Sequence, residues 1–204
     1  MNKGQKIGIF AGSFDPVHAG HIQSAKKALA DLRLDMVYFV VEPRPRFKQG
    51  VKAFEHRSTM MRLAIAEDSS LKQIVIDEPY CTTAETIPML MNRFEGASLY
   101  ILMGDDVVRR ISEWSNRDEL FNQAELVVLR RKLTIEHIKA ILDKVSIVSG
   151  KKPTYHIVEN PLSPHSSTEI KQALKAGKQP EGLHPDVLAY AKAQNIYGSS
   201  GVGS

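Results

Sequence analysis

The sequence predicts an α/β fold in which helices cover both faces of a parallel β-sheet. Short β-branched, apolar runs alternate with amphipathic helical patterns along most of the 204 residues. Such runs are typical of strands that are buried on both faces. With 43% hydrophobic and 25% charged residues, the chain has enough apolar material for a core on each face of a sheet.

Six strands are expected, separated by helices and polar loops. The strands are predicted at 7–10, 36–41, 71–76, 99–103, 126–129 and 155–158. Apolar residues at helical spacing predict helices at 22–32, 54–65, 87–94, 134–142, 170–174 and 185–194. Thr82 or Thr83 is expected to cap the third helix, and Gly177 is expected to end the fifth.

One domain is expected over residues 1–197, with a small helical portion at about 163–197 and a disordered tail at 198–204. No apolar run approaches the ~20 residues of a membrane span, and no secretory signal is expected. The single cysteine, Cys81, favours a reducing, cytoplasmic compartment. A net charge of +4 and a pI near 9.1 suit anionic substrates rather than a nucleic-acid or membrane partner. A homo-oligomer is compatible with the sequence.

Residues 12–21, Gly-Ser-Phe-Asp-Pro-Val-His-Ala-Gly-His, connect the first strand to the first helix. A helix N-terminus offers unpaired N–H groups and a positive dipole end, so it favours a phosphate. Gly12 lets the backbone approach a ligand, and Gly20 allows a tight turn into the helix. His18 and His21 can donate hydrogen bonds to phosphate oxygens as charge develops on them. A histidine pair at this spacing can equally be a surface or capping feature.

This ten-residue string resembles the signature of the nucleotidyltransferases with a Rossmann-like fold, the His-x-Gly-His superfamily. The resemblance implies a Rossmann-like, doubly wound parallel sheet and a loop that cradles the triphosphate of a nucleotide. It implies that His18 and His21 are catalytic and polarise the α-phosphate region of ATP. It also implies that Gly12, Ser13 and Phe14 bind ATP.

The segment at 42–50 follows the second strand and contains two prolines and four charged residues, so regular structure is not expected there. It is either a solvated loop or a mobile basic lid over phosphates. In the family this segment carries a lysine near the nucleotide, which implies ATP binding by Lys48.

Two further segments follow the third and fourth strands. Thr83-Ala84-Glu85-Thr86 resembles the family's Thr-x-Asp-Thr segment, which implies that Thr83 and Glu85 bind the mononucleotide, although capping alone would explain the threonines. Gly104-Asp105-Asp106 ends the fourth strand, where ligands collect in open parallel sheets. The two acids could hold a metal or cap the next helix. The family's Gly-x-Asp contacts the nucleotide, which implies ATP binding by Gly104 and Asp106.

Trp114 and Arg131 complete the predicted mononucleotide site. A lone tryptophan is usually a core residue, but its face can also stack on a pyridine ring, as the resemblance implies. Ser115 stands where the family often has a tyrosine, and Arg131 lacks the proline and glycine that commonly follow it. Arg131 is nevertheless the better-placed candidate for an acidic group on the second substrate.

Residues 163–171, Ser-Pro-His-Ser-Ser-Thr-Glu-Ile-Lys, open the fifth predicted helix. Their hydroxyls are ordinary helix caps, but the string also resembles the family's Ile-Ser-Ser-Thr-x-Ile-Arg motif, which holds the ATP phosphates. The resemblance implies ATP binding by Ser167, Thr168 and Lys171. Lys171 replaces an arginine, which keeps the charge and loses the bidentate fork.

The resemblance spans residues 6 to 197 and is narrowed by these segments to the bacterial nicotinate mononucleotide adenylyltransferases. It implies that ATP and nicotinate mononucleotide react to give deamido-NAD and pyrophosphate. It also implies that Mg²⁺ bridges the phosphates, and no protein ligand of this ion is assigned. The alternatives are adenylyl or cytidylyl transfer to another phosphorylated acceptor, such as nicotinamide mononucleotide or phosphopantetheine, and a catalytically inactive nucleotide-binding module.

Overall fold

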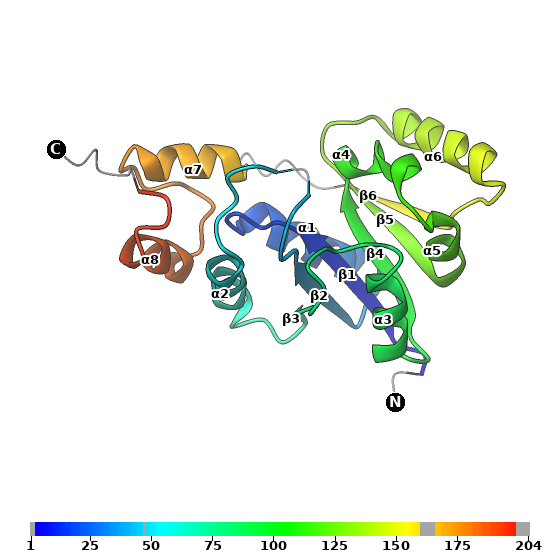
Figure 1. The fold of residues 1–204 in the computed structure, drawn as a ribbon, viewed down its shortest axis with the longest axis horizontal. Helices are drawn as coiled ribbons and strands as arrows, with labels where there is room; N and C mark the ends of the chain where they lie inside the picture. The colour runs from blue at the N-terminus through cyan, green and yellow to red at the C-terminus, as the bar shows by residue number, and fades with distance from the viewer. Residues whose placement is uncertain (1–2, 47, 160–165, 199–204) are drawn as a thin grey trace.

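Six strands form one sheet in which every neighbouring pair is parallel (Figure 1). The computed structural model describes residues 3–46, 48–159 and 166–198. The strand order is β3-β2-β1-β4-β5-β6. The strands are β1 (Lys6–Gly12), β2 (Met36–Val41), β3 (Leu71–Ile74), β4 (Ser98–Gly104), β5 (Ala124–Arg130) and β6 (Tyr155–Glu159).

Helices connect the strands and continue beyond the last one. They are α1 (Ala19–Leu32), α2 (Phe54–Ile65), α3 (Thr86–Arg93), α4 (Asp105–Val108), α5 (Arg117–Gln123), α6 (Ile135–Ser149), α7 (Ser167–Lys175) and α8 (Pro185–Ala193). A short 3₁₀ turn, Ile111–Glu113, follows α4. Within the described ranges no helix is long and apolar enough to cross a membrane.

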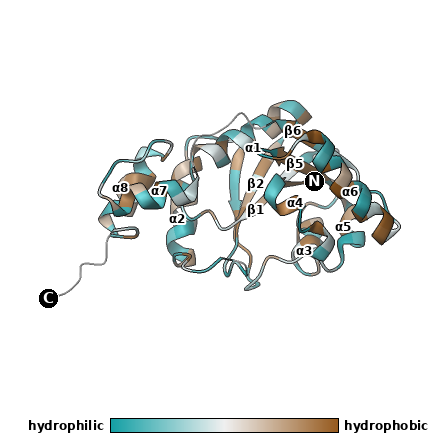
Figure 2. Cartoon of the chain, turned by 90° about the horizontal axis from the view of Figure 1, so that it is seen from above, coloured by the Kyte–Doolittle hydropathy of each residue, from teal (hydrophilic) through white to brown (hydrophobic). Residues whose placement is uncertain are grey.

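Each face of the sheet carries its own apolar core. Helices α1 and α2 cover one face, with α8 packed against α2, and α3, α4, α5 and α6 cover the other. Figure 2 shows these two groups on opposite sides of the strands. Alternate residues of one strand serve the two cores, as Val40 and Val41 of β2 illustrate. The doubly wound α/β fold predicted from the sequence is therefore confirmed.

The order of the strands reverses between β1 and β4, which are neighbours at the centre of the sheet. The chain moves outward through β2 and β3 on one side and through β5 and β6 on the other. Loops that leave the carboxyl ends of the two central strands therefore diverge, and this position is the usual ligand site of the architecture. These are the loops that follow Gly12 and Gly104.

Three local predictions need correction. The third strand ends at Ile74 rather than Ile76, because its pairing with β2 ends at Val40. The helix predicted at 134–142 continues to Ser149, because Val145 stays on the buried face and the chain turns only at Gly150, which has φ 70°.

The helix predicted at 87–94 begins at Thr86, and neither Thr82 nor Thr83 is its N-cap residue. Thr82 instead stabilises the turn before the helix, where its Oγ1 accepts a hydrogen bond from the Glu85 N–H at 3.1 Å.

The C-terminal helices lie at one end of the molecule, beside α2 (Figure 1). Val187 and Ala191 of α8 are buried in the core that α1 and α2 also form. Gly177, with φ 69°, follows the end of α7 as predicted. Residues 163–165 of the predicted helical portion and 199–204 of the predicted tail lie outside the described residues.

Candidate active site

His18 and His21 form a reciprocal cap at the first turn of α1. The Gly20 N–H donates to Nδ1 of His18, and the His18 N–H donates to Nδ1 of His21, both at 3.2 Å. The ring centroids lie 3.8 Å apart. Because Nδ1 is the acceptor in both rings, the proton of each neutral imidazole is on Nε2. Each Nε2–H is on the side of the ring away from the bond that anchors it.

Burial lowers the pKa of His21 well below its usual value, and the neighbouring His18 and the cations Arg131 and Lys48 lower it further. His21 is therefore a neutral hydrogen-bond donor at pH 7. The same effects show that the side chains of Arg131 and Lys48 carry positive charge close to His21. An anion that binds beside the two histidines would meet N–H donors and two cations.

The ring of Phe14 packs against the ring of His21. Its backbone has φ 44°, in the left-handed region, and its ring meets the His21 ring edge-on with centroids 5.0 Å apart. The ring also lies over Gly12, where an added Cβ would come within 3.1 Å of it. Gly12 thus leaves room for Phe14, in addition to the predicted close approach of the backbone to a ligand.

The segment after β2 is hydrogen-bonded to the loop between β1 and α1. The Glu42 N–H donates to Gly12 O at 2.9 Å, and Lys48 Nζ donates to Ser13 Oγ at 2.8 Å. Burial raises the pKa of the Glu42 carboxyl, while nearby cations, Lys48 first among them, oppose this effect. Lys48 is exposed but aimed at the loop before α1.

The start of α7 contacts the loop before α1, so the two sequence motifs that resemble the family lie next to each other. Ser166 is its N-cap residue, so one serine of the string has the expected capping role. Ser167 Oγ donates to Pro16 O at 3.1 Å, and Lys171 Nζ lies 3.0 Å from Oδ2 of the buried Asp15. Thr168 is exposed at the second position of the helix. The two strings, about 150 positions apart in sequence, therefore meet at one place.

Asp105 has a role that differs from both alternatives considered from the sequence. Its Oδ2 accepts the backbone N–H groups of three consecutive residues after β5 at 2.6–2.9 Å, namely Arg131, Lys132 and Leu133. Burial raises the pKa of this carboxyl, but the three hydrogen bonds outweigh burial and the pKa is lowered. Asp105 therefore fixes the loop that carries Arg131.

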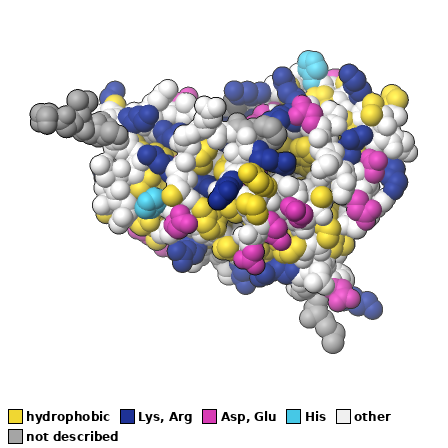
Figure 3. Space-filling view, in the orientation of Figure 1, with side chains coloured by type: hydrophobic (Ala, Val, Ile, Leu, Met, Phe, Trp, Pro, Cys, Tyr) yellow, Lys and Arg dark blue, Asp and Glu magenta, His cyan; other side chains and the backbone are white. Residues whose placement is uncertain are grey.

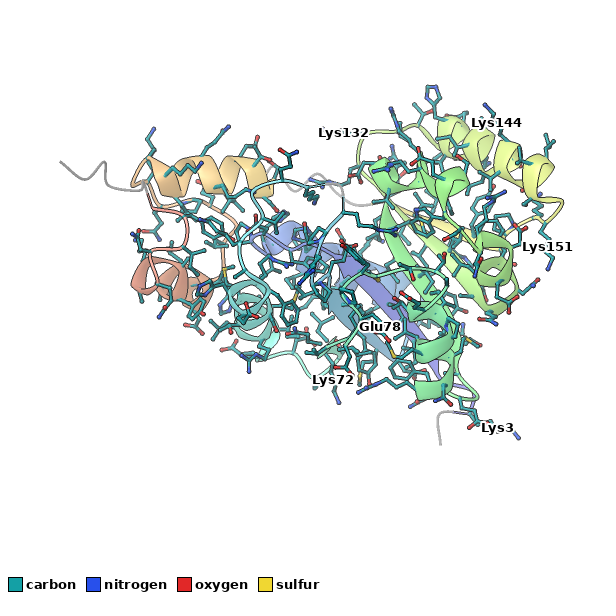
Figure 4. All side chains as sticks on the ribbon, viewed as in Figure 1. Lys3, Lys72, Glu78, Lys132, Lys144 and Lys151 are labelled. Carbon is teal, nitrogen blue, oxygen red and sulfur yellow. The ribbon has the colours of Figure 1, made fainter. Side chains whose placement is uncertain are left out.

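Asp106 is exposed next to Gly104, and a Cβ at Gly104 would collide with the Asp106 carboxylate. Gly104 thus lets this carboxylate fold back over the end of β4. In Figure 4, Lys132 lies on the loop beside α4, and Glu78 lies in the segment between β3 and α3. Figure 3 shows several Lys and Arg side chains over the upper part of the face that is turned toward the viewer.

Two of the residues predicted to bind the mononucleotide, Thr83 and Trp114, lie on neighbouring segments. Thr83 Oγ1 donates to the carbonyl oxygen of Ser115, so the Thr83 and Trp114 segments are in contact. Trp114 is half-buried and packs against the apolar core, whereas Glu85 is exposed and accepts a hydrogen bond from Thr82. The charge of Arg131 acts on His21.

Three buried polar residues escaped the sequence-based assignment, namely Asp15, Arg57 and Tyr197. Tyr197 OH donates to Oδ1 of Asp15 at 2.6 Å, and Arg57 binds three backbone carbonyls. Arg57 was detectable in principle, since it shares a helical face with Phe54 and Met61. A charged residue on an apolar face is expected to be buried with partners.

A metal site and a cysteine nucleophile find little support in the part of the chain that the structure describes. No group of three His, Cys, Asp or Glu side chains there could hold a metal ion. Burial raises the pKa of the Cys81 thiol to about 11, so Cys81 is protonated at neutral pH.

The chain is similar to proteins of one known family. Residues 9–173 match the family model described as cytidylyltransferase-like. A probable nicotinate-nucleotide adenylyltransferase of Solibacter usitatus is 31% identical, over 94% of this chain and 99% of the relative. One from Thermus thermophilus is 33% identical over the same shares, and the nicotinate-nucleotide adenylyltransferase of Bacillus subtilis is 28% identical over 96% of this chain and 100% of its own.

Solved structures share the fold. The nicotinic acid mononucleotide adenylyltransferase of Plasmodium falciparum, complexed with NaAD, superposes with a TM-score of 0.77 at 20% identity, covering 95% of this chain and 97% of its own. The same enzyme complexed with APC gives a TM-score of 0.75 at 19% identity, with the same coverage.

Proposed function

The chain belongs to the cytidylyltransferase-like family and, within it, to the nicotinate-nucleotide adenylyltransferases, and from this premise we propose that it joins ATP and nicotinate mononucleotide. The products are deamido-NAD and pyrophosphate. The observation that carries the proposal is the pair of anchored imidazoles at the point where the strand order reverses. We further propose a cytoplasmic location, which the single cysteine supports because it favours a reducing compartment.

The reaction needs no nucleophile from the protein. A phosphate oxygen of the mononucleotide forms a bond to the α-phosphorus of ATP. The bond from that phosphorus to the bridging oxygen breaks, and its electron pair leaves with pyrophosphate. Catalysis consists of aligning the two phosphates and neutralising the charge that develops on them. His18 and His21 would do this through their Nε2–H groups, which their backbone anchors hold in place.

The remaining residues divide between the substrates. Ser13, Phe14 and Lys48 would hold the triphosphate from the side of β1, together with Gly12. Ser167, Thr168 and Lys171 would hold it from α7, and Gly104 and Asp106 would contact the nucleotide at the end of β4. Thr83, Glu85 and Trp114 would bind the mononucleotide. Arg131, whose charge acts on His21, would attract the phosphate of that substrate or its acidic ring substituent.

A magnesium ion fits this site as a companion of ATP rather than as a resident of the protein. Asp105 uses its Oδ2 on three backbone N–H groups, which leaves Asp106 as the exposed carboxylate at the end of β4. Mg²⁺ commonly keeps several waters and binds through substrate phosphates with few protein ligands. Bound in that way, it would neutralise charge on the phosphates.

Pyrophosphate release with purified protein tests the function. ATP would be supplied with nicotinate mononucleotide, nicotinamide mononucleotide or phosphopantetheine in parallel reactions, each with and without Mg²⁺. We expect the highest kcat/KM with nicotinate mononucleotide and identification of deamido-NAD by mass. Faster turnover with another acceptor would replace the substrate. ATP binding without pyrophosphate release from any acceptor would favour an inactive nucleotide-binding module.

A further inference from the structure

Arg57 of α2 is the most buried charged side chain described in the structure, with 1% of its surface exposed. Its guanidinium donates to three backbone carbonyls: Nη1 to Ser13 O at 2.8 Å, Nη2 to Pro43 O at 2.9 Å and Nε to Lys52 O at 2.7 Å. A guanidinium is suited to this task, because its five N–H donors form a rigid planar fork that an ammonium group lacks.

The three carbonyls come from segments that surround the predicted phosphate site. Pro43 and Lys52 stand at the two ends of the 43–52 loop, which carries Lys48, and Ser13 is in the loop before α1. Lys48 in turn donates to Ser13 Oγ. One side chain thus joins both ends of the 43–52 loop to the first loop.

The bond to Ser13 also orients the next amide. The C=O of Ser13 and the N–H of Phe14 belong to one planar peptide unit, in which they point in opposite directions when the peptide is trans. The only cis peptide bond among the described residues joins Asp15 and Pro16, so this unit is trans. Because Arg57 holds the Ser13 carbonyl, the Phe14 N–H is directed away from the guanidinium.

We propose that Arg57 is a positioning residue that sets the affinity for the triphosphate without touching it. It does so by fixing the Ser13–Phe14 peptide and the ends of the loop that carries Lys48. The negative charge of Asp15 acts on the same guanidinium and offsets part of the cost of its burial. The inference rests on the proposed function for its kinetic consequence, but the local geometry can be tested without substrate.

The kinetic test compares Arg57→Lys and Arg57→Gln with wild type. Lysine keeps the charge but cannot donate to three carbonyls in one plane. We expect KM for ATP to rise roughly tenfold or more, as for loss of one hydrogen bond to a charged group, while KM for the mononucleotide changes less than about twofold. Arg62→Lys is the matched control, because Arg62 is exposed on the same helix and bonds only locally to Thr59.

This pattern separates positioning from a general loss of structure. A variant that merely lowers the fraction of folded enzyme would reduce kcat and leave both KM values unchanged. That result, or a wild-type KM for ATP in folded Arg57→Lys, would refute the proposal.

A second measurement uses the ligand-free protein and so stays valid whatever the substrate is. The ¹⁵N–¹H resonance of the Phe14 amide reports on the peptide whose carbonyl Arg57 binds. We expect it to shift in Arg57→Lys, and we expect no shift in Arg62→Lys. Unchanged Phe14 and Lys48 amide resonances in Arg57→Lys would overturn the positioning role, whereas inactivity of the wild-type protein would overturn only the proposed function.

Discussion

At the scale of single residues, the two histidines at the start of α1 combine a structural and a chemical task. Their Nδ1 atoms replace the serine and glutamate oxygens of an ordinary capping box. The same hydrogen bonds fix the tautomer, so that both Nε2–H groups are donors. Capping and phosphate binding, which the sequence left as alternatives, are therefore compatible in one pair of side chains.

Replacing His21 tests the chemical task. We expect His21→Ala to lower turnover by about two to three orders of magnitude, the typical loss of one preorganised donor that stabilises developing charge. The measurement is steady-state pyrophosphate release, with circular dichroism to confirm folding. Gln23→Ala is the control, because Gln23 is exposed on the same helix. Near-wild-type turnover in folded His21→Ala would remove His21 from the mechanism.

The lowered pKa of His21 also predicts a pH-dependent stability. In the unfolded chain His21 binds a proton near pH 6.5, whereas the folded protein keeps it neutral to lower pH. The unfolded state therefore takes up more protons below pH 6.5, and stability falls as the pH falls. His21→Gln retains a capping side chain without titrating. Urea unfolding at pH 7.5 and 5.5 should show wild type losing about 1 kcal/mol more than the variant. Equal losses would contradict the prediction.

At the scale of secondary-structure elements, the site depends on contacts between loops rather than on any one helix. The start of α7 contacts the loop before α1, and Asp105 at the start of α4 holds the loop after β5. These helices and loops come from different parts of the sequence, and all of them lie at the carboxyl edge of the sheet. Hydrogen-bond donors and charged groups that are far apart in the sequence therefore lie close together at this edge.

Asp105→Asn tests one of these links. The neutral amide loses charge-assisted hydrogen bonds to three N–H groups, so we expect a loss of about 2 kcal/mol in the free energy of unfolding at pH 7. Because the folded pKa of Asp105 is lowered, this stabilisation is present above about pH 4 and is lost as the pH falls through the folded pKa.

Urea unfolding at pH 7 and at low pH measures this effect, with Asp106→Asn as the control. Asp106 is exposed, so its substitution should change stability by less than about 0.5 kcal/mol. A difference between wild type and Asp105→Asn that stays constant down to strongly acidic pH would exclude the charged hydrogen bonds as its source.

At the scale of the whole molecule, the loop before α1 is in contact with the C-terminal part of the described chain. Tyr197 is 2% exposed, and its hydroxyl donates to Asp15, 182 positions earlier. Burial raises the pKa of this phenol, and the bond to Asp15 raises it further, so Tyr197 stays a donor throughout the physiological range. Lys171 binds the second oxygen of the same carboxylate. Asp15 therefore joins the first loop to both C-terminal segments.

Tyr197→Phe removes one donor from a buried carboxylate and keeps the ring. We expect it to lower the free energy of unfolding by about 1.5–3 kcal/mol in urea titrations at pH 7. Tyr190→Phe is the matched control. Its hydroxyl bonds to His56 at 3.0 Å in a partly exposed contact, so its loss should cost about 1 kcal/mol or less. Equal effects of the two substitutions would contradict the role given to Asp15.

The sequence by itself determined the fold class, the six strands and the nature of the first loop. These features depend on local patterns: apolar runs, helical spacing and a ten-residue string whose glycines and histidines lie close together in the chain. The site residues assigned from the strings around His21 and Ser167 lie on segments that the structure brings into contact.

Only the tertiary structure decided the roles of Asp105, Arg57 and Asp15. Each binds groups from distant segments, and no local pattern encodes which carbonyl or N–H will stand opposite a buried charge. A side chain that is taken out of water must find partners wherever the fold places them. That placement follows from the packing of the whole sheet and its helices, so it becomes visible only in three dimensions.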